Sequence, residues 1–205
     1  MDDFDDPDLD LEALAREAPV LSRVKRFAES LDGVPWFANL GEPMTPGAKA
    51  CAAQYLEGLG FPDADVGLLV DWEDAAAAAE TTDVDSPAWE AEELLRADVT
   101  GRALEVLSDE ALHIAMAVVA EAVSEPAKEA MRQASFIWDV EDGPSQRLAV
   151  GAAVQAAHQA AMTLLAAGEA DPDFDAEAHP FAAKFRLFEF GRWPVGVVGG
   201  SFNVF

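Results

Sequence analysis

The feature that most constrains this chain is a stretch without any charged side chain, from Leu148 to Gly168. A segment of this length could cross a bilayer or form the core of a helical protein. It is rich in alanine and contains Gln155, His158 and Gln159, which are costly in hydrocarbon without partners. We therefore predict a buried central helix over residues 148–167 and no membrane span.

The three polar side chains of this stretch must be satisfied inside a helical bundle. Gln155, His158 and Gln159 can form a buried polar network, line a small-ligand pocket, or point outward at one edge of the helix. We expect by default that these side chains form hydrogen bonds within the protein. A ligand pocket is the alternative, because bundle interiors often contain such sites.

The remaining sequence predicts a fold that is all-α or nearly so. A Thr or Ser followed by Pro marks helix starts at Thr45-Pro46 and Ser86-Pro87, and Ser108 opens another helix. Helical spacing predicts further helices at about 9–31, at 66–79 and around Phe181 to Phe188. Gly101 is a candidate break, and Pro126 is expected to end one helix and begin the next.

The C-terminal segment has a different character. Two apolar runs on either side of Gly199-Gly200 predict a short β-hairpin at about 195–205. An isolated hairpin is marginal in water, so its apolar face should dock on the helices. We expect a flexible acidic tail over residues 1–8 and a single helical domain over residues 9–205.

The charge limits the possible partners. Asp and Glu number 39 against 13 Lys and Arg, which gives a net charge of −26 and a pI near 4.1. Such a surface repels phosphate backbones and anionic headgroups, so nucleic-acid and membrane-surface binding are disfavoured. Basic proteins and metal cations remain as partners, and adaptation for solubility or high salt is the other explanation.

The single cysteine and the N-terminus indicate the compartment. Cys51 has no second cysteine to pair with, so an intramolecular disulfide is excluded, and its alanine neighbours suggest that it fills core volume. The N-terminus carries acids where a secretory signal would carry cations. We expect a cytoplasmic location.

Acidic residues are concentrated in one block. No Lys or Arg occurs between Ala50 and Leu95, whereas twelve acids do: Glu57, Asp63, Asp65, Asp71, Glu73, Asp74, Glu80, Asp83, Asp85, Glu90, Glu92 and Glu93. The block is either a solvated face, in part paired with the basic clusters at residues 16–26 and 184–192, or a docking surface.

The favoured hypothesis for function is a non-enzymatic interaction or inhibitory protein that docks a basic partner through residues 57–93. The expected binding residues are the acids Asp63, Asp65, Asp71, Glu73, Asp74, Asp83 and Asp85. This hypothesis depends on the distribution of charge alone.

The alternative is a metal-binding helical bundle. Glu110 and His113 have the i, i+3 spacing with which di-iron carboxylate bundles aim two ligands inward. Glu121 and His158 would complete a site for iron, manganese or zinc. The constellation is incomplete, because no second Glu-x-x-His exists and Glu110 and His113 lie opposite the apolar stripe of their helix.

No motif specifies an enzymatic reaction, and no cofactor is predicted outside this alternative. The acids from Asp171 to Glu177 resemble a calcium loop, but Ala176 and Ala182 occupy the discriminating Gly and Glu positions. Ser201 lacks the second glycine of a nucleophile elbow.

Overall fold

The computed structural model describes residues 19–81, 85–141, 143–167, 174–198 and 200–205. Its helices are α2 (Leu21–Ser30), α3 (Pro46–Gly58), α4 (Trp72–Glu80), α5 (Pro87–Val106), α6 (Asp109–Ile137), α7 (Pro144–Ala166) and α8 (Pro180–Glu189), with a 3-10 turn η1 (Leu31–Gly33). Its strands are β1 (Asp65–Leu68), β2 (Pro194–Val198) and β3 (Ser201–Val204). The prediction of a mostly helical fold with a C-terminal strand pair is confirmed.

The predicted helix starts are confirmed by their caps. The side chains of Thr45, Ser86 and Ser108 each accept a hydrogen bond from a backbone N–H in the first turn of α3, α5 and α6. α8 is capped by His179, whose Nδ1 accepts from the Phe181 N–H at 3.1 Å. These side chains satisfy donors that a helix N-terminus leaves unpaired.

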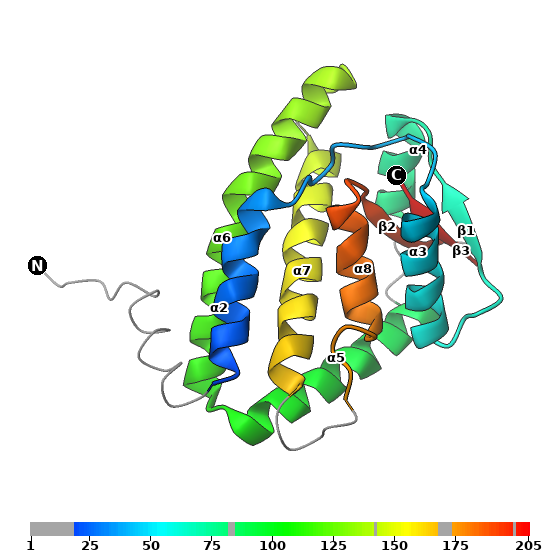
Figure 1. Ribbon diagram of the computed structural model, residues 1–205. Coiled ribbons are helices and arrows are strands. Elements are labelled where there is room, and N and C mark those ends of the chain that lie inside the picture. Colours follow the sequence, from blue (N-terminus) through cyan, green and yellow to red (C-terminus); the bar gives the residue numbers. More distant parts are fainter. Residues whose placement is uncertain (1–18, 82–84, 142, 168–173, 199) are drawn as a thin grey trace, which may run out of the picture.

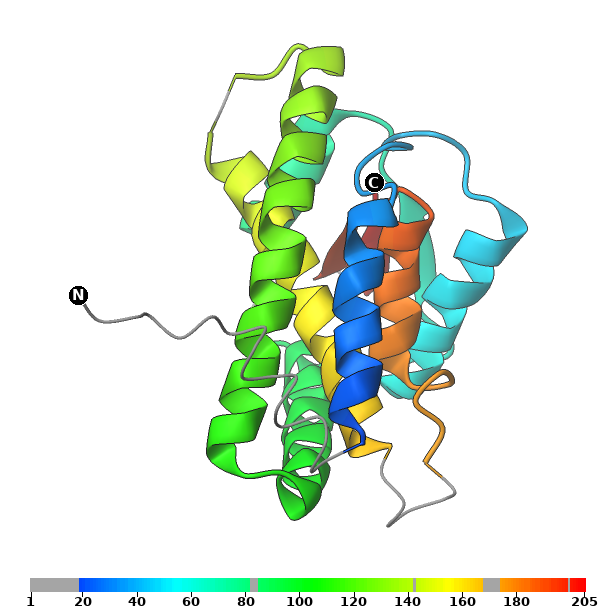
Figure 2. The same cartoon turned by 60° about the vertical axis from the view of Figure 1, so that its left-hand side comes forward.

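The central position of α7 is also confirmed. It lies between α6 and α8 in Figure 1 and in Figure 2, and it contacts α2, α4, α5, α6, α8 and β2. Small buried residues such as Ala153, Ala156 and Ala160 line it, and they let its neighbours approach closely. By length and composition alone α7 could cross a membrane, but 56% of its most apolar window is buried inside the protein.

α7 begins earlier than the sequence suggested. The uncharged stretch was expected to form the helix from 148, whereas Pro144 occupies the first turn and Arg147 lies within the helix. Proline is well suited to a first helical turn, where its missing N–H is not needed.

One predicted helix is wrong in its first half. Residues 66–79 were expected to be helical, but β1 occupies residues 65–68 and α4 begins only at Trp72. The Asp71 side chain sets this start by accepting a hydrogen bond from the Asp74 N–H. β1 pairs in parallel with β3, and the ladder continues with Leu69 N–H donating to the Val204 carbonyl oxygen.

The sheet therefore has three strands in the order β1-β3-β2. The predicted hairpin is present: β2 and β3 are antiparallel, with Val198 opposite Ser201. β1 adds a partner from far away in the sequence, which local pattern cannot reveal. It lies at the outer edge of the sheet in Figure 1.

Two expected breaks are absent from the described helices. α5 continues through Gly101 and α6 continues through Pro126. An interior proline costs about 3 kcal/mol and a glycine about 1 kcal/mol relative to alanine. Val123 and Met131 on either side of Pro126 are buried, and burying apolar side chains of this size contributes roughly 1.5–3 kcal/mol each. Tertiary packing thus outweighs the local preference.

The helix expected over residues 9–31 is described from α2 onward, and residues 9–18 lie outside the described part of the chain. The same holds for the predicted tail over residues 1–8 and for Gly168, the expected end of the central helix. The extent of the domain from residue 9 stays a prediction.

Candidate functional site

A buried ion pair joins two helices that are far apart in the sequence. Glu92 of α5 is 6% exposed and Lys184 of α8 is 8% exposed. Lys184 Nζ donates to Glu92 Oε1 at 2.5 Å, and the hydroxyl of Tyr55 on α3 donates to the same oxygen at 2.5 Å. Arg96 Nη2 lies 3.8 Å from the second carboxylate oxygen. Three helices are therefore joined at one carboxylate.

The Glu92 carboxylate is charged at neutral pH. Burial alone would raise the pKa of Glu92, but the charge and hydrogen bond of Lys184, helped by the Tyr55 hydroxyl, hold the pKa below the ordinary 4.5. Burial, followed by the nearby Glu92 carboxylate, raises the pKa of Tyr55 well above 10. Glu92 is therefore an anion and Tyr55 a neutral donor.

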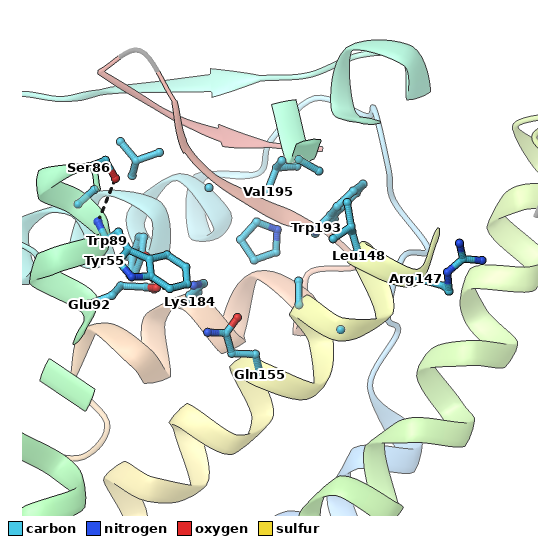
Figure 3. Close-up of a pocket in the computed structure, with 17 residues that line it drawn as sticks. Tyr55, Ser86, Trp89, Glu92, Arg147, Leu148, Gln155, Lys184, Trp193 and Val195 are labelled. Carbon is cyan, nitrogen blue, oxygen red and sulfur yellow. Dashed lines mark hydrogen bonds and ion pairs between the residues drawn. The ribbon is translucent and has the colours of Figure 1, made fainter. Parts of the chain in front are cut away.

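A cavity of about 270 Å³ lies against this ion pair. Its walls come from α5, α7 and β2, and Tyr55, Glu92 and Lys184 are at one side of it, as Figure 3 shows. Gln155 reaches it from α7, and Trp193 and Val195 border it near the start of β2. Pockets of this kind, mostly apolar with a few polar groups, are the usual sites for small ligands.

The three polar residues of the central helix are placed in three different environments. Gln155 lines the cavity. His158 Nε2 lies 3.1 Å from the Met116 carbonyl oxygen, and burial lowers its pKa below 6.5 despite that contact. Gln159 is 3% exposed, and neither its amide nitrogen nor its oxygen has a hydrogen-bond partner among the described residues.

The residues of the proposed metal site are not brought together. Glu110, His113 and Glu121 are exposed on α6, whereas His158 is engaged with the Met116 carbonyl in the interior. No group of three or more His, Cys, Asp or Glu side chains in the described residues could hold a metal ion. The expected i, i+3 pair faces solvent because the opposite face of α6 supplies the core.

The acids predicted to bind a partner are at the surface. Asp63, Asp65, Asp71, Glu73, Asp74 and Asp85 are all exposed, and Asp83 lies outside the described residues. Within the described ranges, no Lys or Arg forms an ion pair with Asp63, Asp65, Glu73 or Asp74. Asp71 has a second role as the cap of α4.

The basic residues have other contacts. In the two basic clusters, three arginines bond to backbone carbonyl oxygens: Arg23 to Ala167, Arg186 to Glu177, and Arg192 to Glu42 and Pro43. The basic residues of α5 and α6 pair with acids on their own helices: Arg96 with Glu93, Arg102 with Asp98, Lys128 with Glu125 and Arg132 with Glu129. None of these contacts neutralises the acids around β1.

Sequence reasoning missed the Glu92–Lys184 pair and grouped Glu92 with the surface acids. The helical spacing of α5 could have revealed that Glu92 is buried. The buried residues of this helix lie on one face and are Ala88, Glu92, Val99 and Ala103. Cys51, by contrast, is buried among apolar side chains as expected, and burial raises the pKa of its thiol.

Comparison of the chain with protein-family models, with curated proteins and with solved structures found no match. Function must therefore be inferred from the side chains of this molecule alone.

Proposed function

We propose that this chain is a non-enzymatic interaction protein that docks a basic, extended segment of a partner along the free edge of β1. The main support is the juxtaposition of an open sheet edge with exposed acids that have no cationic partner in the described structure. The partner is the basic protein that the charge distribution predicts, and its bound segment is an extended strand beside β1.

β1 offers backbone hydrogen bonds to a partner. Within the described residues, it pairs with β3 and with no other strand. Because Leu69 N–H donates to Val204, alternation in a parallel ladder turns residues 65, 67 and 69 toward β3. The N–H and C=O groups of Val66 and Leu68 then face outward, where an added strand can bond to them.

Side chains near the edge are suited to an amphipathic strand. Val66 is 36% exposed and Val70 is 58% exposed, so each can contact an apolar side chain of an incoming segment. Asp63 and Asp65 lie at the start of β1, and Glu73 and Asp74 lie in the first turn of α4 that follows it. Cationic side chains of the partner can meet carboxylates at both ends.

A short peptide of alternating lysine and valine, labelled with a fluorophore, tests the proposal by fluorescence anisotropy. We expect saturable binding that weakens as salt is added. The same peptide with N-methylated alternate residues keeps its charge but loses strand donors, and it should bind at least tenfold more weakly if each lost hydrogen bond contributes about 1 kcal/mol.

The protein variant combines Asp63→Asn, Asp65→Asn, Glu73→Gln and Asp74→Asn. Exposed charge pairs contribute about 0.2–1 kcal/mol each, so affinity should fall on the order of tenfold. The matched control removes the same charge elsewhere, through Glu29→Gln, Glu105→Gln, Glu110→Gln and Glu121→Gln. An equal loss of peptide affinity in both variants would mean that only the net charge matters, and it would contradict docking at β1.

A further inference from the structure

The cavity beside Glu92 is balanced in charge. Its buried carboxylate is neutralised by Lys184, and both groups already bond to each other. Arg147 is at the margin and points away from the other labelled side chains in Figure 3. Among the described residues, a ligand carrying a net charge would find no free counter-ion beside the Glu92–Lys184 pair, because Arg147 is exposed at the margin, and an anion would be repelled by a chain of net charge −26. A neutral ligand is favoured.

The cavity contains a polar edge that the protein does not use. The Gln155 amide points from α7 toward β2, and in the described part of the chain no group hydrogen-bonds to it. A carboxamide presents a donor and an acceptor side by side, which matches another amide or an amidine edge. Trp193, which also lines the cavity, is 1% exposed and offers its ring as an apolar wall.

The other walls are flat or apolar. The ring of Trp89 and the aliphatic chains of Leu148 and Val197 border the space. A Cβ added at Gly151 or at Gly196 would meet nothing within 4 Å, so room remains on the α7 side and on the β2 side. With a volume of about 270 Å³, the cavity is slightly smaller than typical ligand pockets, which span about 300–1,000 Å³. The ligand is smaller than a typical drug.

We propose that this cavity binds a small, neutral, planar heteroaromatic molecule with an amide-like edge, such as a nucleobase or an aromatic carboxamide, through the side-chain amide of Gln155. The ring lies among the aromatic and aliphatic walls. This binding is separate from docking at β1, because it uses none of the exposed acids.

Calorimetric titration with adenine, uracil and nicotinamide tests the proposal. Toluene serves as a ring without a polar edge, and adenosine monophosphate as a charged probe. We expect saturable one-to-one binding of at least one neutral amide-edged probe, and binding at least tenfold weaker for toluene and for the monophosphate. If none of the three neutral probes binds at its solubility limit, or if toluene binds as tightly as they do, the proposal is overturned.

Two substitutions locate the site. Gln155→Leu keeps the size of the side chain and removes two hydrogen bonds, so affinity should fall on the order of tenfold. Gln133→Leu on the exposed surface of α6 is the matched control and should leave affinity unchanged. Circular dichroism establishes that both variants fold. Undiminished binding in Gln155→Leu contradicts the assignment.

Discussion

Glu92 and the acids near the start of α4 belong to the same cation-free block of sequence, yet the fold uses them in opposite ways. Glu92 is 6% exposed and bonded to Lys184 and Tyr55. Glu73 and Asp74 are exposed and without ion pairs in the described structure. A run of acidic residues in the sequence determines the net charge of a region. The position of each acid on its helix determines whether its side chain is buried or exposed.

The two groups should therefore respond differently to substitution. A buried charge that loses its partner is costly, because the remaining ion is desolvated without compensation. An exposed acid surrounded by other acids loses little and relieves repulsion when it is neutralised.

The largest effect is expected for Lys184→Met. Removing one partner of a buried pair costs about 3–5 kcal/mol, and here it leaves the Glu92 carboxylate buried with only Tyr55 and the distant Arg96 nearby. Urea denaturation gives the loss in unfolding free energy. Lys128→Met, which removes an exposed pair with Glu125, is the control and should change stability by less than about 1 kcal/mol.

The double variant Glu92→Leu with Lys184→Met tests whether the loss of stability comes from the unpaired buried charge. Replacing both ions by apolar groups should recover much of the loss of Lys184→Met. A double variant as unstable as the sum of the two single variants would mean that the pair is not the source of the effect.

A second effect is expected from pH, because burial keeps His179 neutral in the folded protein. Burial lowers the pKa of His179 from 6.5 to about 4. The unfolded state thus binds more protons between these values, so stability present above pH 6.5 is lost as the pH falls toward 4. Protonation also removes the Nδ1 acceptor that caps α8.

The measurement for this effect is the unfolding free energy as a function of pH. His179→Asn keeps a capping side chain and removes one titration, so it should lose less stability between pH 6.5 and 5 than the parent protein; the loss that remains is the contribution of His158, whose pKa burial also lowers. Parallel curves for the two proteins would show that another group is responsible. Below this range Glu92, whose pKa lies under 4.5, adds a further loss as it is protonated.

A smaller difference in stability is expected between substitutions of Asp71 and Asp63, two exposed acids near β1. Asp71 accepts the Asp74 N–H at the start of α4, and loss of such a cap costs about 1 kcal/mol. Asp63 makes no such contact, so Asp63→Ala should change stability by less than about 0.5 kcal/mol. Thermal unfolding of Asp71→Ala and Asp63→Ala tests this difference, and equal melting temperatures would contradict the capping role.

The smallest effect concerns the continuous helix α5. Gly101 lies inside α5, is exposed and leaves open space around an added Cβ. Gly101→Ala should therefore stabilise the protein by about 0.5–1 kcal/mol. A destabilised variant, measured by urea denaturation, would indicate a break in the helix at this position.

Local features of the sequence were sufficient for much of the fold. The caps at Thr45, Ser86 and Ser108 and the hairpin around Gly200 depend on neighbouring residues, so pattern alone located them. β1 could not be found in this way, because its partner β3 is far along the chain and the apolar residues from Val66 to Val70 also fit a helical period. The cavity could not be predicted from local sequence either, because its walls come from segments far apart in the chain: α3, α5, α7, α8 and β2.

The most direct test of the contrast within the acidic block is a side-by-side urea denaturation of two proteins. One carries Glu92→Gln, and the other carries Asp63→Asn, Asp65→Asn, Glu73→Gln and Asp74→Asn together. We predict a loss of about 3–5 kcal/mol for the single substitution and a change of less than about 1 kcal/mol for the fourfold one. Equal losses, or a stable Glu92→Gln protein, would contradict the division into one buried structural acid and an exposed group free to bind.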